Sequence, residues 1–420
     1  MKILYYEEPR GRNLSSVHAY EVCSNLSKLG HNIVFVKAPP QKPGARLWDE
    51  IGTGLSAWKR IKDLLLLSWI LERLRGELTL LWLFWCEASI FLSIFALILK
   101  NRDGLDVIYR RHNLLNSEYF LAKLFGIPSV KEVNGIVVDE MRIARKGDRV
   151  SLWTMHRIEK WNMPKAHRII VVTSELKNLL YNDYRVSEDR VVVIENGANT
   201  DLFIPTDSED ARKELCLDPS DGFVCFVGGL LRWQGVEYLI QSAPLVMKEC
   251  PSTKFIIVGY GAMREELVNL ARETGISDKF IFTGFIPYEN VPLYINASDV
   301  CVAPFVEERG ERTGVSPLKL CEYMACEKPV VASAISGLEI LESYNAGILV
   351  LPESPQELAN AIIRLLQDPE LRKKMGENGR KYVVENRSWE SVAGKVAEVC
   401  EETANRYKAK LKRGQYLKCY

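Results

Sequence analysis

The stretch TGVSPLKLCEYMACEKPVVAS, residues 313–333, combines a glycine turn, a helix and an apolar strand. Its helix is expected to begin near Pro317, because proline is favoured in the first turn of a helix. The backbone N–H groups of Ser316, Leu318 and Lys319 would then be free to bind an anion such as phosphate. Glu322 follows one turn later, where its carboxylate can accept hydrogen bonds from two hydroxyl groups. The stretch therefore predicts a site for the ribose and diphosphate of a sugar nucleotide.

Three other strand-like runs in the same half of the chain end in glycine. They are FVGGLLRWQG (226–235), FIIVGYGAMREEL (255–267) and FTGFIP (282–287), with Gly228, Gly229, Gly259 and Gly284 at the strand ends. Glycine lets the backbone approach a ligand closely, although each turn alone is also an ordinary strand-to-helix connection. Three such turns in one domain predict one edge of a cleft, to which Arg232 adds a positive charge.

The chain alternates strand-like and helix-like segments, and the alternation restarts after a polar, proline-containing stretch at about 200–220. Continuous Val/Ile runs between helices indicate parallel sheets covered on both faces. The 420 residues are also too many for one ordinary core. We predict an α/β protein of two doubly wound Rossmann-like domains facing across a cleft, 1–203 and 204–395. Residues 354–386 are expected to be helical, and a C-terminal helix over 396–420 can cross back to the first domain.

Composition excludes several classes of function. The net charge is +1, from 55 basic and 54 acidic residues, so no global field would recruit nucleic acid. The ten cysteines form no C-x-x-C pair, which argues against a zinc or iron–sulfur site and against a disulfide framework. We expect core cysteines in a reducing cytosol, hence a cytoplasmic protein with no metal and no cofactor beyond its co-substrate.

An apolar segment at about 58–100 has two interpretations. It carries Trp58, Trp69, Trp82 and Trp85 among many leucines, with basic residues at its start. Tryptophan and basic residues beside an apolar face suit a helix lying at the cytoplasmic face of a membrane. The alternative is a set of packed helices that covers the first sheet. Glu87 would lie near the middle of any spanning segment, which argues against a transmembrane helix.

KLCEYMACEKPVVAS resembles the nucleotide-sugar signature of family 4 retaining glycosyltransferases (glycosyl transferases group 1), which have the GT-B fold of two Rossmann-like domains. HRIIVVTSELKNLL, VVVIENGANTDLF, FVGGLLRWQGVEYLI and the strands after them follow in the family's order, so the resemblance covers nearly the whole chain. It implies transfer of a sugar from a nucleotide-diphosphate sugar to a glycan or polyprenyl-phosphate-linked acceptor, with retention and without metal. It also implies that Glu322 grips the ribose, while amides near Leu318 and basic side chains hold the diphosphate. The implied donor site is Gly228, Gly229, Gly259, Gly284, Ile286, Ser316, Leu318, Lys319 and Glu322.

The chain departs from the family pattern at several positions. Gly314 stands where a sugar-contacting glutamate is usual, and Glu311 is the nearest carboxylate that can substitute. Gly229 and Gln234 stand where the family has arginine and lysine, so Lys319 and Arg232 are expected to supply the catalytic charge, with Arg309 and Arg312 as further candidates. Asn134 replaces a common histidine and joins Lys319, Arg232 and Glu311 as a catalytic candidate. The first-domain candidates for acceptor or donor contact are Ser15, Ser16, His18, Arg110, His112 and Glu140.

Two other functions stay open at this point. A GT-B nucleotide-sugar epimerase would use the same cleft without a separate acceptor. A non-catalytic member would bind the nucleotide sugar as a scaffold, and the departures at Gly314, Gly229 and Gln234 favour it. Glu322, Lys319 and the strand-end glycines favour the transferase.

Overall fold

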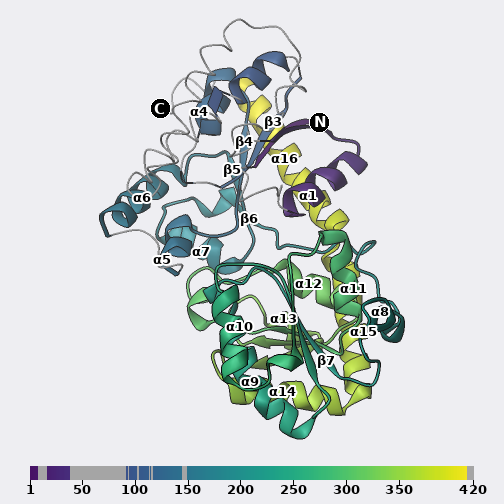
Figure 1. Cartoon of the computed structure of the whole chain (residues 1–420). Helices are drawn as coiled ribbons and strands as arrows, with labels where there is room; N and C mark the ends of the chain where they lie inside the picture. The colour runs from purple at the N-terminus through teal and green to yellow at the C-terminus, as the bar shows by residue number, and fades with distance from the viewer. Residues whose placement is uncertain are drawn as a thin grey trace, which may run out of the picture.

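The computed structural model describes residues 1–7, 17–37, 91–92, 94–101, 104–112, 114, 117–143 and 149–413. The predictions at Ser15 and Ser16, and nearly all of the apolar segment at 58–100, lie outside these residues. Two parallel six-stranded sheets, each between two layers of helices, form two domains, one above the other in Figure 1. The predicted doubly wound α/β architecture is confirmed.

The first sheet has the order β2-β1-β3-β4-β5-β6. Its strands are β1 (Lys2–Glu7), β2 (Asn32–Lys37), β3 (Val107–Arg111), β4 (Ser129–Val133), β5 (Arg168–Val171) and β6 (Val191–Val193). Side chains alternate between its faces, so Ile3 and Tyr5 pack under α1 (Val17–Lys28) and α16 (Trp389–Lys412). Leu4 and Ile108 pack on the opposite face, under α4 (Ser117–Phe125). The helices α5 (Val137–Ile143), α6 (Arg149–Asn162) and α7 (Ser174–Asn182) continue that opposite layer.

The second sheet has the order β12-β11-β10-β7-β8-β9. Its strands are β7 (Phe223–Val227), β8 (Lys254–Val258), β9 (Phe280–Gly284), β10 (Val300–Ala303), β11 (Val330–Ser333) and β12 (Gly347–Val350). One face is covered by α9 (Val236–Glu249), α10 (Arg264–Glu273) and α14 (Pro355–Gln367). The other is covered by α11 (Val291–Asn296), α12 (Leu318–Ala325), α13 (Ile340–Ser343) and α15 (Pro369–Asn386). The short α8 (Ser208–Glu214) follows the junction between the domains.

The stretch at 354–386, predicted to be helical, consists of two helices, α14 and α15. The side chain of Asp368 accepts a hydrogen bond from the N–H of Leu371 and caps α15, and Pro369 occupies its first turn. Proline has no N–H to continue the preceding helix, so α14 ends at Gln367.

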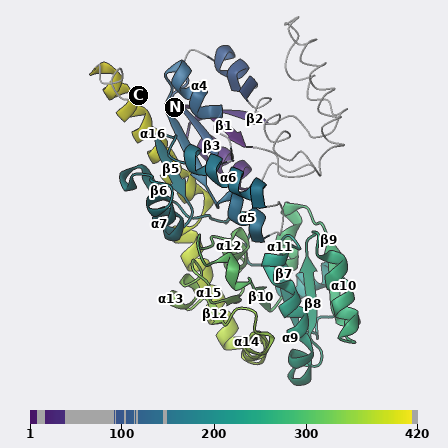
Figure 2. The ribbon, with the colours of Figure 1, turned by 90° about the vertical axis from the view of Figure 1, so that its left-hand side faces the viewer.

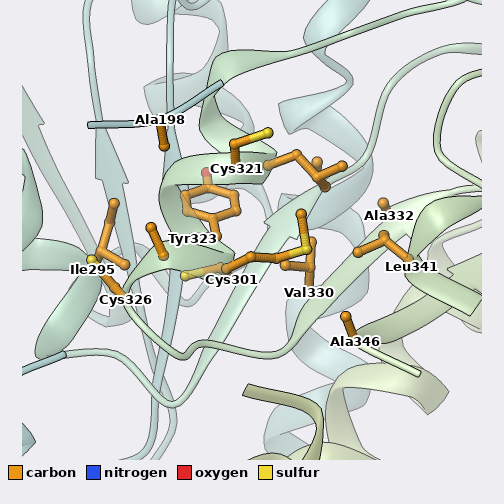
Figure 3. Close-up of a cluster of buried hydrophobic side chains, with 14 of the residues drawn as sticks. Ala198, Ile295, Cys301, Cys321, Tyr323, Cys326, Val330, Ala332, Leu341 and Ala346 are labelled. Carbon is orange, nitrogen blue, oxygen red and sulfur yellow. The ribbon is translucent and has the colours of Figure 1, made fainter. Parts of the chain in front are cut away.

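Cysteines serve as small apolar side chains in the second core. Cys301, Cys321 and Cys326 lie around the ring of Tyr323 between the sheet and α12 (Figure 3). The eight cysteines among the described residues are all free thiols. Burial raises the pKa of the Cys321 and Cys326 thiols to about 12, so both stay protonated.

The C-terminal helix α16 leaves the second domain and packs on the first, as both views show (Figures 1 and 2). It begins at Trp389, where the Ser388 side chain accepts a hydrogen bond from the N–H of Ser391. Trp389 is buried against the ring of His18, with 5.0 Å between ring centroids. None of the described helices is both long and apolar enough to cross a bilayer.

Candidate donor site between the domains

A cavity of about 410 Å³ lies where the carboxyl ends of both sheets meet. Ligands of doubly wound sheets bind at such edges, where the strand order reverses, and here β7 and β10 flank the reversal. Its volume falls in the range of about 300–1,000 Å³ that is usual for small-molecule sites. The first domain contributes Val17, Arg111, Asn134, Glu140, Val172 and Asn196; the second contributes Val227, Gly228, Trp233, Gln234, Tyr288, Val291, Phe305, Arg309 and the run Gly314–Lys319 with Glu322.

Lys319 is the cation at the second-domain wall. It belongs to the first turn of α12, and its Nζ donates a hydrogen bond of 2.6 Å to Oε1 of Gln234. The same Nζ lies 3.8 Å from the ring centroid of Phe226. A Cβ placed on Gly228 would lie only 2.8 Å from it, so the glycine leaves the space that the ammonium occupies. The cation is therefore held at the strand-end turn of β7.

Burial lowers the pKa of Lys319 to about 7, against the opposing effect of Glu322. The side chain is only 7% exposed, so a protonated ammonium there lacks most of its hydration. An anionic ligand in the cavity would restore the protonated state by Coulomb attraction.

Glu322 lies three residues beyond Lys319 on α12 and is 6% exposed. Burial raises its pKa to about 7, while its neighbours Tyr288 and Lys319 act in the opposite direction. Glu21 of α1 adds a second carboxylate across the domain boundary and raises this pKa further. Glu21 itself accepts a hydrogen bond of 2.9 Å from Nδ2 of Asn199. A hydroxyl-bearing ligand would favour the ionised form of Glu322 by donating hydrogen bonds to it.

The turn before α12 is fixed by the first domain. Asn196 donates from its backbone N–H to Oγ of Ser316 (3.0 Å) and from Nδ2 to the Ser316 carbonyl (2.6 Å). The Thr173 hydroxyl donates to the carbonyl of Thr313. Gly314 between them has φ +58°, a conformation that favours glycine. The helix begins at Leu318 with Pro317 as its N-cap, one residue from the predicted start, and its N-terminus faces the cavity.

Glu132 organises the first-domain wall. Its carboxylate accepts hydrogen bonds from the Tyr109 hydroxyl and from Nδ2 of Asn134 (2.7 Å), and Nε2 of His18 lies 3.1 Å away. Burial would raise the pKa of Glu132, but His18, Arg111 and these hydrogen bonds together lower it. Burial lowers the pKa of His18 to about 4, so the neutral ring donates its Nε2 proton to the carboxylate.

Asn134 is consequently oriented by Glu132. Nδ2 is used by the carboxylate, while Oδ1 is buried and makes no protein hydrogen bond, although the residue lines the cavity. Glu140 lines the same wall, and its Oε1 would lie 2.7 Å from a Cβ placed on Gly135. The wall therefore offers hydrogen-bond acceptors, which suit the hydroxyl groups of a sugar.

The predicted residues divide into those at the cavity and those away from it. Gly228, Ser316, Leu318, Lys319, Glu322, Asn134 and Glu140 line it. The lining does not include Gly229, Gly259, Gly284 or Ile286. Gly259 packs against the carbonyl of Gly228, where a Cβ would overlap that oxygen. Arg232 lines a neighbouring cavity of about 320 Å³, and Glu311 and Arg312 line another of about 130 Å³.

Three predicted first-domain residues are buried behind the wall instead of lining it. His18 bonds to Glu132, and His112 lies 3.0 Å from Oε1 of Glu159, a buried carboxylate that also accepts from the N–H of Val137. Arg110 is 1% exposed, because side chains alternate along β3. The alternation places Arg111 at the cavity in its stead.

The sequence interpretation did not single out Glu132, Asn196 or Tyr288. Glu132 precedes Asn134 by two positions in the segment KEVNG. A carboxylate within a strand has no sequence pattern that predicts its role. Asn196 belongs to the quoted VVVIENGANTDLF, and only its contact with Ser316, 120 residues away, reveals its function. Tyr288 reaches Glu322 from the short turn Tyr288–Asn290, which has no sequence signature.

Two family descriptions match the chain in succession. Glycosyltransferase Family 4 matches residues 15–202, and Glycosyl transferases group 1 matches residues 207–382. The chain belongs to the family 4 glycosyltransferases. The boundary between the two matches falls at the polar stretch after Asn199, and the second match contains the quoted α12 segment.

Curated relatives of this family 4 chain share about 30% identity with it. An uncharacterized glycosyltransferase of Methanocaldococcus jannaschii is 31% identical over 60% of this chain and 63% of its own length. The alpha-D-kanosaminyltransferase of Streptomyces kanamyceticus is 29% identical over 62% of this chain and 67% of its own. The D-inositol 3-phosphate glycosyltransferase of Corynebacterium aurimucosum is 30% identical over 65% and 66%. The matched part spans about two thirds of these proteins, and slightly less of the first.

Solved structures show the GT-B fold. Sucrose-phosphate synthase from Thermosynechococcus elongatus superposes with a TM-score of 0.73 at 23% identity, over 96% of this chain and 98% of that one. Anabaena HepE, solved in complex with UDP, gives 0.66 at 19% identity, over 96% and 100%. HepE has also been solved with UDP-glucose, with the same TM-score of 0.66 at 17% identity over 96% and 100%.

Proposed function

We propose that this family 4 protein transfers a sugar from a nucleotide-diphosphate sugar to a glycan or polyprenyl-phosphate-linked acceptor, with retention of configuration and without a metal ion. The observation that carries the proposal is the pair Lys319 and Glu322. Both lie at one cavity wall on α12, with less than a tenth of their surface exposed. They pair a cation for the diphosphate with a carboxylate for ribose hydroxyls.

The donor then spans the cavity. Its diphosphate lies at Gly228, Lys319 and the N-terminus of α12, where backbone N–H groups and the ammonium attract negative charge. Its sugar points to the first-domain wall, where Asn134 and Glu140 line the cavity and their side chains can bond to hydroxyl groups.

Cleavage of the bond to the sugar leaves a nucleoside diphosphate with additional negative charge. Lys319, fixed between Gln234 and Phe226, stabilises that charge without rearrangement. Arg111 and Arg309 add positive charge around the cavity. These cations support a reaction that needs no metal ion, and retention is proposed from the family resemblance.

Thermal-shift measurements with UDP-, GDP- and ADP-sugars, each with and without EDTA, test the donor site. We expect one nucleotide series to raise the melting temperature of the wild type, because a ligand that binds the folded state stabilises it by mass action. Glu322→Ala should lose the shift, whereas Glu342→Ala, an exposed carboxylate on α13, should keep it. UDP-sugars are the first probe, since HepE binds UDP and UDP-glucose.

Transfer itself is measured with the stabilising donor and lipid-linked or free glycan acceptors, followed by NMR of the new anomeric centre. An α-donor that yields an α-product agrees with retention. Conversion of the donor sugar without an acceptor would identify an epimerase. Binding without either reaction would identify a nucleotide-sugar scaffold, and EDTA-sensitive transfer would refute metal independence.

A further inference from the structure

The helices α4 and α6 cover the face of the first sheet that lies opposite α1 and α16. Leu121 and Ala122 of α4 pack with Leu4 and Ile108, and Met155 of α6 packs with Ile169. Both helices form the left-hand side of the first domain in Figure 1 and turn toward the viewer in Figure 2. Their outer surface is away from the donor cavity.

This outer surface is unusually apolar for an exposed one. Phe120, Leu124, Val150, Trp153 and Trp161 are each between 48% and 72% exposed. Val150, Trp153 and Trp161 follow the spacing of one face of α6, and Phe120 and Leu124 are one turn apart on α4. Exposed apolar residues are ordinary when scattered, but a cluster marks an interaction surface.

Contacts between rings and cations join the two helices. The ring centroids of Phe120 and Trp161 are 6.5 Å apart. Nζ of Lys165 lies over the Trp161 ring and 5.7 Å from the centroid of Phe120. The guanidinium of Arg157 lies 5.4 Å from the centroid of Trp153.

Positive charge predominates among the described side chains of the surface. Exposed cations accompany the rings: Lys123 on α4 and Arg149, Arg157 and Lys160 on α6. The only carboxylate among the described side chains of α4 and α6 is Glu159, which is fully buried and bound to His112. By contrast, the exposed side of α15 mixes Lys373 and Lys374 with Glu370, Glu377 and Glu385, as solvated helices usually do.

We propose that this aromatic–basic surface (Phe120, Lys123, Leu124, Arg149, Val150, Trp153, Arg157, Lys160, Trp161 and Lys165) lies on a bilayer that contains anionic lipids. Tryptophan side chains occupy the interface between headgroups and acyl chains, while lysine and arginine contact lipid phosphates. The juxtaposition of rings and cations matches that environment on both counts. The proposal concerns binding of the first domain and does not rest on sugar transfer.

Cosedimentation of the full chain with vesicles tests the surface. We expect binding to vesicles of phosphatidylcholine mixed with phosphatidylglycerol, little binding to phosphatidylcholine alone, and weaker binding as salt rises. Trp153→Glu/Trp161→Glu should lower the partition coefficient at least about tenfold. The matched control is Leu351→Glu, which places the same charge at an exposed apolar residue of the second domain.

A second pair of variants separates charge from apolar contact. Arg157→Glu/Lys160→Glu should abolish the preference for anionic vesicles, and Lys373→Glu/Lys374→Glu, the same change on α15, should not. Thermal unfolding of every variant shows that the fold is retained. Absence of wild-type binding, or equal binding by the α6 variants and the wild type, would overturn the proposal. So would a wild-type dimer in light scattering that Trp153→Glu/Trp161→Glu converts to monomer, because the surface would then pair with a second copy.

Discussion

The ammonium of Lys319 lies 2.6 Å from the side-chain oxygen of Gln234. Gln234 stands at the position where the family resemblance leads us to expect a lysine, on the turn after β7. Lys319 of α12 thus places its ammonium beside Gln234, the residue that stands in place of the expected lysine. A positive charge at this turn is supplied from a segment 85 residues further along the chain.

Replacement of Lys319 by methionine should weaken nucleotide-sugar binding about 10- to 100-fold, the usual effect of losing a hydrogen bond to a charged group. Isothermal titration with UDP-glucose measures the dissociation constant. Lys373→Met, an exposed lysine of α15, is the control. An unchanged dissociation constant in Lys319→Met would mean that the diphosphate is bound elsewhere.

Donor affinity should depend on pH with a maximum near neutrality. Burial raises the pKa of Glu322 to about 7, so below that pH a carboxyl must lose its proton to accept ribose hydroxyl groups. Burial lowers the pKa of Lys319 to about 7, so above that pH an amine must gain a proton to bind diphosphate. Both changes cost binding free energy, and the association constant should fall on either side.

The two limbs of this profile are assigned by substitution. Glu322→Gln should weaken binding and remove the acid limb, while Lys319→Arg should remove the alkaline limb because arginine stays charged. Titration with a nucleotide sugar between pH 5.5 and 8.5, about one and a half units on either side of neutrality, measures both. A profile that keeps its shape in both variants would assign the titration to other groups, such as Glu21.

Asn134→Ala should lower kcat/KM about 10- to 100-fold, because it removes a polar side chain from the cavity wall. Its stability should change by less than about 1 kcal/mol, since the residue is only partly buried. Glu132→Gln should instead destabilise the protein by about 2–4 kcal/mol, because it disturbs the contacts of a buried carboxylate with Tyr109, Asn134 and His18. Chemical denaturation and steady-state kinetics separate the two effects, and a stability loss in Asn134→Ala as large as that in Glu132→Gln would contradict the assignment.

Replacement by alanine should change the free energy of unfolding in opposite directions at Gly197, which packs against Arg387, and at Gly394, which lies within α16. A Cβ on Gly197 would overlap the backbone carbonyl of Arg387, so Gly197→Ala should lower the free energy of unfolding by about 2 kcal/mol. A Cβ on Gly394 meets nothing within 4 Å inside α16, so Gly394→Ala should raise it by about 0.5–1 kcal/mol. Urea denaturation measures both, and a loss of stability in Gly394→Ala would refute the expected helix gain.

Local pattern was sufficient for the domains and for one wall of the site. The Val/Ile runs predicted parallel strands because such strands are buried on both faces. Of the four strand-end glycines that predicted a cleft edge, Gly228 lines the cavity, beside Lys319. Lys319 and Glu322 were readable because one short helix carries both, so their spacing along the sequence already places them at one wall.

The first-domain wall of the cavity could not be predicted from the sequence in the same way. Whether Arg110 or Arg111 reaches the cavity depends on which face of β3 the α1–α16 layer covers, and a shift of one residue exchanges them. Asn134 acquires a direction only because Glu132 takes its Nδ2 protons, and Glu132 is held by Tyr109 and His18 from other elements.

The sequence by itself determined the two doubly wound domains and the α12 pair, because both follow from residue spacing within single elements. Only the tertiary structure decided which side chains oppose that pair. Arg111, Asn134 and Asn196 reach the cavity from separate strands and turns of the first domain. Their proximity to α12 results from packing of the domains through contacts such as Asn196 with Ser316, which join residues 120 positions apart and leave no periodic trace in the chain.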